Sequence, residues 1–324
     1  MVSQFPLDPM HLIDLGISKK LLILLLSDLN KITEKTLSEV YEAYTKYIPR
    51  EFTRSTRSFK DIPRWKATEF RFFILYGCLA LFKNKINDEK FYHICLLTTS
   101  LRLLSQTNCQ ENIEAAQKCI NEFVELYPRF CGLKNVGYNI HSLLHFPKYV
   151  ALYGEIDNFS GYKYENYMQE IKKMIKSPVN ILQQISNKIL DQQFLKEHLK
   201  DDSCMKTRNM KIIEFDRFLL EGNKKDCCCA VSIGATQVPF IISSFTMINK
   251  EKMMVGRRFL SVAPFFERPI NSAHIGIIEV ADLAEANENI AVSNILFKYC
   301  RLPVTANTWL LIKMLHETEK VRFI

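Results

Sequence analysis

The sequence lacks the signatures of several protein classes. It opens without the basic, apolar and small-residue regions of a signal peptide, and its most apolar runs, at 21–26 and 70–82, are too short to cross a bilayer. It has no glycine-rich loop that could hold a phosphate and no Gly-x-Ser-x-Gly motif. Internal repeats and low-complexity segments are also absent. We therefore expect an intracellular protein, nuclear or cytoplasmic, with no membrane partner.

Cysteine spacing excludes two further classes. The ten cysteines include no Cys-x-x-Cys pair, and three of them are adjacent at 227–229. A secreted disulfide framework or a zinc ribbon would show paired, regular spacings. We expect reduced thiols that are mostly buried.

The composition is that of a packed, soluble chain. Of 324 residues, 48% are hydrophobic and 24% charged, which suits one large domain or two ordinary ones. The net charge of +8 permits nucleic-acid binding without requiring it.

Periodicity predicts a mainly α region followed by a small β-rich domain, with domains at 1–200 and 201–324. Apolar residues recur at helical spacing through most of the first part. The expected helices lie at 10–29, 36–47, 66–82, 88–105, 112–127, 136–152, 163–175 and 178–199. After 200, short β-branched and aromatic runs separated by glycine and proline indicate strands. The expected strands lie at 229–233, 239–245, 252–260, 275–280, 295–302 and 309–315. The acidic segment 279–287 is expected to be a short helix or turn.

Two histidines and a glutamate form the first candidate site. His141 and His145 are four residues apart, so on one helix they share a face. Glu165 follows after a glycine-punctuated turn, at the start of another helical pattern. A carboxylate shortly after a histidine pair suggests part of a metal-dependent site, and Asp8 and His11 near the N-terminus are candidate partners.

The stretch 46–71 is the main basic segment. It has eight lysines and arginines against three acids, with aromatic residues interleaved. The cations that would contact DNA phosphates are Arg50, Arg54, Arg57, Arg64 and Lys66. The alternative is a solvated loop of charges around core aromatics.

Three strings in this order resemble one family. Phe-Pro-Leu-Asp-Pro-Met-His at 5–11, within the similar segment 5–22, resembles the region around the second catalytic aspartate of DDE transposases of the CACTA/EnSpm type. The catalytic subunit of the V(D)J recombinase, a distant relative, has a similar Asp-x-x-His. Arg-Trp-Lys-Ala-Thr-Glu-Phe-Arg at 64–71 is similar to a string in the helical insertion of animal members. Residues 138–173 resemble the family's histidine pair followed by the helix with the last catalytic glutamate.

The resemblance implies a function and a cofactor. Its fold would be the helical insertion and C-terminal part of an RNase H-like core. Asp8 would be the second aspartate and Glu165 the closing glutamate of a site that holds Mg²⁺, with His11 orienting the site. Such enzymes use two divalent ions, one activating the attacking water or 3′-hydroxyl and one stabilising the leaving oxygen. DNA is the implied partner, and a homodimer is compatible with this interpretation.

The resemblance also implies a missing part. The first catalytic aspartate of the family lies upstream of the second, and this sequence begins seven residues before Asp8. We therefore expect a truncated or domesticated transposase-derived protein without strand-cleavage activity of its own.

Zinc and other functions stay open as alternatives. In relatives, a Cys-x-x-Cys from the insertion and two histidines near the closing glutamate bind a structural zinc. His141 and His145 match those histidines, but the Cys-x-x-Cys motif is absent from this sequence. The alternative for the pair is hydrogen bonding within the helical core. The alternative function is an intracellular helical protein–protein interaction module without a nucleic-acid role. A metal hydrolase that uses the histidine pair and Glu165 is a third possibility.

Overall fold

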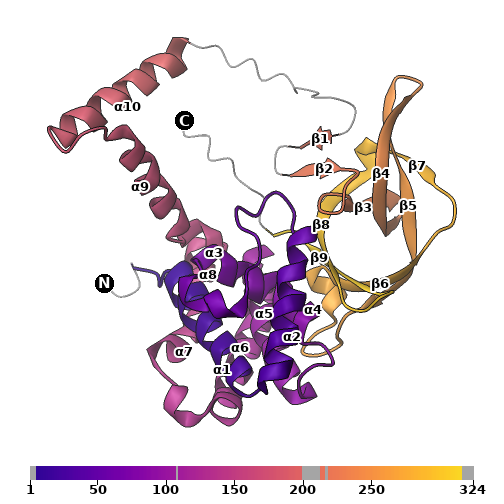
Figure 1. Ribbon diagram of the computed structural model, residues 1–324, viewed down its shortest axis with the longest axis horizontal. Helices are drawn as coiled ribbons and strands as arrows, with labels where there is room; N and C mark the ends of the chain where they lie inside the picture. The colour runs from indigo at the N-terminus through magenta and orange to yellow at the C-terminus, as the bar shows by residue number, and fades with distance from the viewer. Residues whose placement is uncertain (1–4, 107–108, 199–211, 216–217, 316–324) are drawn as a thin grey trace.

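The computed structural model describes residues 5–106, 109–198, 212–215 and 218–315. Helices form one body and an antiparallel sheet forms a second body beside it (Figure 1). This order confirms the predicted succession of a helical part and a β-rich part. The predicted boundary at 200 and 201 lies outside the described residues.

The helical part begins with a π-helical segment, η2, and ends with two helices that project from the body (Figure 1). Its elements are η2 (Met10–Ser18), α1 (Lys19–Ser27), α2 (Lys31–Ala43), α3 (Ala67–Phe72), η5 (Phe73–Gly77), α4 (Cys78–Phe82), α5 (Asp88–Gln106), α6 (Gln110–Cys131), α7 (Tyr138–Leu143), α8 (Phe146–Tyr153), α9 (Tyr162–Met174) and α10 (Ile181–His198). Short 3₁₀ turns connect several of these elements; one of them is η7 (Ile156–Phe159).

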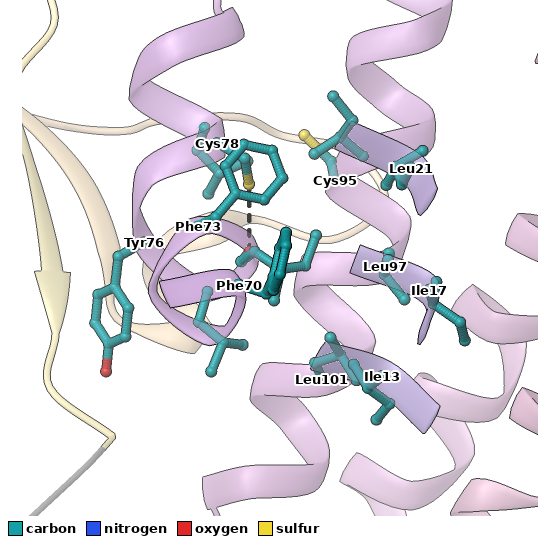
Figure 2. Packing of buried hydrophobic residues seen from close by; sticks show 14 of the residues in the cluster. Ile13, Ile17, Leu21, Phe70, Phe73, Tyr76, Cys78, Cys95, Leu97 and Leu101 are labelled. Carbon is teal, nitrogen blue, oxygen red and sulfur yellow. Dashed lines mark hydrogen bonds between the residues drawn. The ribbon is translucent and has the colours of Figure 1, made fainter. Parts of the chain in front are cut away.

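Helix α5 is the centre of this body. Its residues 93–104 are all buried, as expected for a helix that is covered on every side. Every residue of the continuous segment α3–η5–α4 except Thr68 is also buried. Figure 2 shows Phe73 and Cys78 of this segment with Leu97 of α5 and Ile17 of η2 in one core.

The sheet closes on itself. Its strands are β3 (Cys228–Ile233), β4 (Thr236–Ile248), β5 (Glu251–Pro264), β6 (Ile277–Leu283), β7 (Glu288–Ala291), β8 (Ile295–Pro303) and β9 (Trp309–Lys313). The order is β4-β3-β8-β9-β6-β5-β7, every pair is antiparallel, and β4 also pairs with β5. A short hairpin of β1 (Ile212–Glu214) and β2 (Leu219–Glu221) precedes it. Strand alternation places Cys228 and Ala230 in one cluster and Cys227 and Cys229 in another.

The two bodies share one hydrophobic core. Ile277, Cys300 and Ile312 on one face of the sheet belong to the same cluster as the helices. Arg102 of α5 is fully buried and donates to the carbonyl oxygens of Ile275 (3.1 Å) and Lys313 (2.9 Å). Burial lowers the pKa of Arg102 to about 10, so its guanidinium stays charged at neutral pH.

Several local predictions need correction. Helix α2 begins at Lys31 rather than 36, because the Asn30 side chain accepts from the Thr33 N–H at 2.8 Å and caps it. The segment 279–283 is strand, the end of β6, and only 284–287 forms the turn. Residues 6–8, which precede the first helical turn, are irregular. The predicted helix 136–152 is two helices, α7 and α8, separated at Leu144 and His145.

The prediction that the thiols are mostly buried is confirmed for the described chain. Eight of its nine cysteines are buried, and Cys109 is exposed. None of the helices in the described ranges is both long and apolar enough to cross a membrane.

Candidate functional site

Asp8 lies against the first turn of α9. Its Oδ1 accepts from the backbone N–H of Met10 (3.1 Å) and of Gly161 (2.7 Å), the residue before α9. A Cβ at Gly161 would stand 2.6 Å from Asp8 Oδ2, so the absence of a side chain there permits this approach. The segment before η2 and the start of α9 are thus joined across about 150 residues of sequence.

His11 stands between Asp8 and Glu165. Its Nδ1 shares a hydrogen bond with Asp8 Oδ2, and its Nε2 lies 4.0 Å from Glu165 Oε1. The Asp8 side chain is 28% exposed, while the side chains of His11 and Glu165 are 62% and 61% exposed. The structure therefore brings together the two acids predicted as catalytic, with His11 beside both, in a site open to solvent.

A partly buried polar layer lies beside this cluster, with Asp14 and Arg71 as its buried members. Asp14, one turn after His11 on η2, accepts from the Tyr162 hydroxyl at 2.7 Å. Arg71 of α3 lies over the Tyr162 ring, 5.4 Å from its centroid, and donates to Asp157 Oδ1 at 2.6 Å. Burial raises the pKa of Asp14 to about 7, although Arg71 and Tyr162 oppose the shift. This layer fixes the first turn of α9 on η2.

The sequence did not single out Asp14 and Tyr162. The signal was their spacing: Asp14 follows His11 by three residues, and Tyr162 precedes Glu165 by three. On helices these offsets place each residue beside its partner in the cluster. Neither residue carries a recognisable motif, so only the fold shows that they meet.

The donor set suits a hard cation held mostly by water. Asp8 and Glu165 offer carboxylate oxygens, and Mg²⁺ is commonly bound by one or two carboxylates with several waters retained. Within the described ranges, no group of three or more His, Cys, Asp or Glu side chains could hold a metal ion. Asp8 and Glu165 therefore form a two-carboxylate arrangement and not a complete metal cage.

The histidine pair lies on the surface. His141 is in α7 and His145 immediately precedes α8, and both are exposed, so the expected hydrogen bonding within the core is wrong. Their ring centroids are 5.4 Å apart at an interplanar angle of 79°. A structural zinc needs four nitrogen or sulfur ligands. No set of three candidate ligands occurs around the pair in the described chain.

Two of the predicted DNA-contacting arginines have partners within the chain. Arg50 pairs with Glu221 and, through Nε, with Asp226 Oδ2 at 3.2 Å. Arg57 forms a bidentate pair with Glu69, at 2.6 and 2.7 Å. Both pairs hold the segment 49–58 on the protein.

The other three predicted cations are exposed. Arg54 and Lys66 face solvent, and Arg64 is 83% exposed with Asp61 at 3.9 Å. The interleaved aromatics Phe59 and Trp65 are buried in the core. The basic stretch thus combines solvated charges with core aromatics, and its free cations are fewer than the sequence suggests.

Comparison with known protein families gives a match over part of the chain. The model of a domain of unknown function, DUF8592, matches residues 175–314, which cover α10 and the sheet. No curated protein and no solved structure matches the chain. Asp8, His11 and Glu165 lie outside the matched residues, so the transposase resemblance rests on the strings at 5–22, 64–71 and 138–173.

Proposed function

We propose that the chain derives from a DDE transposase of the CACTA/EnSpm type. In this proposal Asp8 and Glu165 are the second aspartate and the closing glutamate of its divalent-cation site. The helical part would then be the insertion and C-terminal portion of an RNase H-like core. DNA is the substrate class that follows from this descent.

One observation carries the proposal. Asp8 and Glu165 are 157 positions apart in sequence, yet both lie beside the same imidazole, that of His11. A chance pair of acids in a 324-residue protein has no reason to meet around the histidine of an Asp-x-x-His string. Hard oxygen donors open to solvent are also what a hydrated Mg²⁺ requires.

The chain's own residues are not expected to cleave DNA. Two-metal strand transfer requires several carboxylates that converge on both ions. The nearby acids Asp14 and Asp157 are committed to Tyr162 and Arg71. We therefore propose a transposase-derived protein whose residues bind DNA and a divalent cation without catalysing strand cleavage.

Manganese binding tests the proposal. Mn²⁺ replaces Mg²⁺ at carboxylate sites, and its electron paramagnetic resonance signal separates bound from free ion. We expect one weak site in the unaltered protein and at least about tenfold weaker binding in Asp8→Asn and in Glu165→Gln, because each removes one of two charged ligands. Glu170→Gln is the control, since Glu170 is also on α9 but pairs with Lys173. Equal Mn²⁺ binding by all four proteins would refute the assignment.

A second candidate function is a protein-interaction module. On α10, Leu182 is 82%, Leu190 59% and Phe194 61% exposed, and such apolar surface commonly marks a protein contact. A second copy of the chain is the simplest partner. Sedimentation of the unaltered protein and of Leu190→Glu tests it, with Ile32→Glu, an 80% exposed position on α2, as control. A monomer at all concentrations, together with salt-sensitive DNA binding, would favour the first function.

A further inference from the structure

Helix α9 is exposed on most of its surface. It leaves the helical body beside the candidate metal site and projects from it with α10 (Figure 1). All residues from 163 to 169 are exposed, including Tyr164 at 74% and Met168 at 52%. An exposed helix with large apolar side chains on its surface is typical of one that contacts a partner.

One face of α9 continues the metal site. Tyr164, Met168 and Lys172 are spaced by four and form one stripe along the helix, and Glu165, seven residues before Lys172, lies at the edge of this stripe. We call these four residues the Glu165 face. At 1.5 Å per residue, Lys172 lies about 10 Å beyond Glu165 along the helix axis.

Lys172 adds a positive charge to this face beside the negative charge of Glu165. In the part of the chain that the structure describes, Lys172 forms no ion pair, whereas its neighbour Lys173 pairs with Glu170 at 2.5 Å on another face. The segment 162–176 carries four lysines and two glutamates. The segment 162–176 therefore has a net positive charge. Its exposed Lys172 and Tyr164 lie on the same helix as Glu165, close to the two carboxylates of the candidate site.

We propose that the Glu165 face binds a DNA strand with unpaired bases. Lys172 contacts a phosphate, and Tyr164 offers its ring for a base to stack on. Stacking on an aromatic ring beside backbone-tracking cations is the general mode of single-strand binding. This inference rests on the proposed function, because the Glu165 face would hold the strand with one phosphate close to the cation that Asp8 and Glu165 are proposed to bind.

In this proposal the basic stretch 46–71 is not the sole surface that contacts DNA. Arg50 and Arg57 in that stretch are held by carboxylates of the chain. The Glu165 face instead places a cation and an aromatic ring on the same helix as Glu165, the proposed cation ligand.

Fluorescence anisotropy with a labelled single-stranded oligonucleotide tests this surface. We expect Tyr164→Ala to weaken binding about tenfold, because it removes one stacking platform. Lys172→Gln should weaken it about fivefold at low salt and reduce the slope of log affinity against log salt by about 0.7, the value for one phosphate contact on a single strand. Lys173→Gln, at the adjacent position, is the matched control and should leave both quantities unchanged.

The outcomes separate the inference from the function it rests on. If the unaltered protein binds DNA and both face variants bind it equally well, the Glu165 face is not the surface, while the proposed function stands. A duplex bound more tightly than the single strand, with no loss in Tyr164→Ala, also overturns the inference. If no DNA of either form binds at low salt, the proposed function itself fails.

Discussion

Replacing Lys298 by methionine should strongly destabilise the protein. Lys298, on β8, is fully buried, and its Nζ contacts Glu51 Oε1 and Oε2 (2.9 and 2.8 Å), Asp226 Oδ1 (2.7 Å) and the Leu219 carbonyl oxygen (2.7 Å). Methionine keeps a similar length and removes the charge. Glu51 lies in the helical part of the chain, so this network links the helices to the sheet.

The magnitude follows from what stays behind. Asp226 keeps its pair with Arg50. Among the described residues, Glu51, whose side chain is 5% exposed, keeps only the Leu219 N–H at 2.9 Å. Breaking a buried ion pair by removing one partner costs about 3–5 kcal/mol, because a charge is left uncompensated. For a chain of this size, roughly 2 °C per kcal/mol converts that loss to a fall in Tm of about 6–10 °C.

The two tryptophans make the assay specific. Trp65 is in the helical body and Trp309 is in β9, so single-tryptophan variants report on each body by fluorescence during urea unfolding. We expect both transitions to shift, because the two bodies share one core. Lys252→Met, at an exposed position on β5, is the control. A loss of unfolding free energy below about 1 kcal/mol would show that the buried ion pairs of Lys298 contribute little. A shift of the Trp309 transition alone would show that the network does not link the two bodies.

Three further predictions concern the site. Between about pH 4 and pH 7 the folded protein holds a proton on Asp14 that the unfolded chain has released, so this residue makes the free energy of unfolding fall as pH rises. Asp14→Asn should flatten this pH dependence, measured by urea unfolding at a series of pH values. An unchanged slope would contradict the raised pKa of Asp14. Gly161→Ala places a Cβ 2.6 Å from Asp8 Oδ2 and should weaken Mn²⁺ binding several-fold, because Asp8 is displaced from its position. The Tm should change by less than about 2 °C, since the part-exposed Asp8 can move aside. Unchanged Mn²⁺ binding would show that Gly161 is not needed to position Asp8. Tyr162→Phe leaves the buried Asp14 without its hydrogen bond and should lower the free energy of unfolding by about 1–3 kcal/mol. Urea unfolding measures this loss, with Tyr164→Phe as an exposed control. Equal stability of the two variants would show that the hydrogen bond is not needed.

The element types could be predicted because their patterns are local. Helical spacing located α5, and alternating β-branched runs located β3 and β8, each within a few residues. Residues 281–283 were misassigned to a helix or turn, because their pairing with β5 outweighs the low strand propensity of Asp282. Closure of the sheet also depends on the pairing of β3 with β8, for example Cys229 with Lys298, which lie far apart in sequence, so no local pattern encodes it.

The candidate site could be predicted only in part. The resemblance identified Asp8 and Glu165, and the fold places both at His11. The partners of Arg50 and Arg57 could not be foreseen, because Glu221 lies 171 positions from Arg50 and Glu69 is an unremarkable acid in sequence. Surface exposure of His141 and His145 depends on where α7 ends, and the pair's spacing of four does not reveal that break.

The central claim is that one divalent cation contacts both Asp8 and Glu165. Fe²⁺ can occupy an Mg²⁺ site, and with ascorbate and peroxide it cleaves the polypeptide next to its ligands, so mass spectrometry of the fragments maps the cation directly. The account predicts cuts in both 8–11 and 161–165 that excess Mg²⁺ suppresses and Asp8→Asn abolishes. Cuts in only one of these segments, cuts around His141 and His145, or no specific cuts would contradict it.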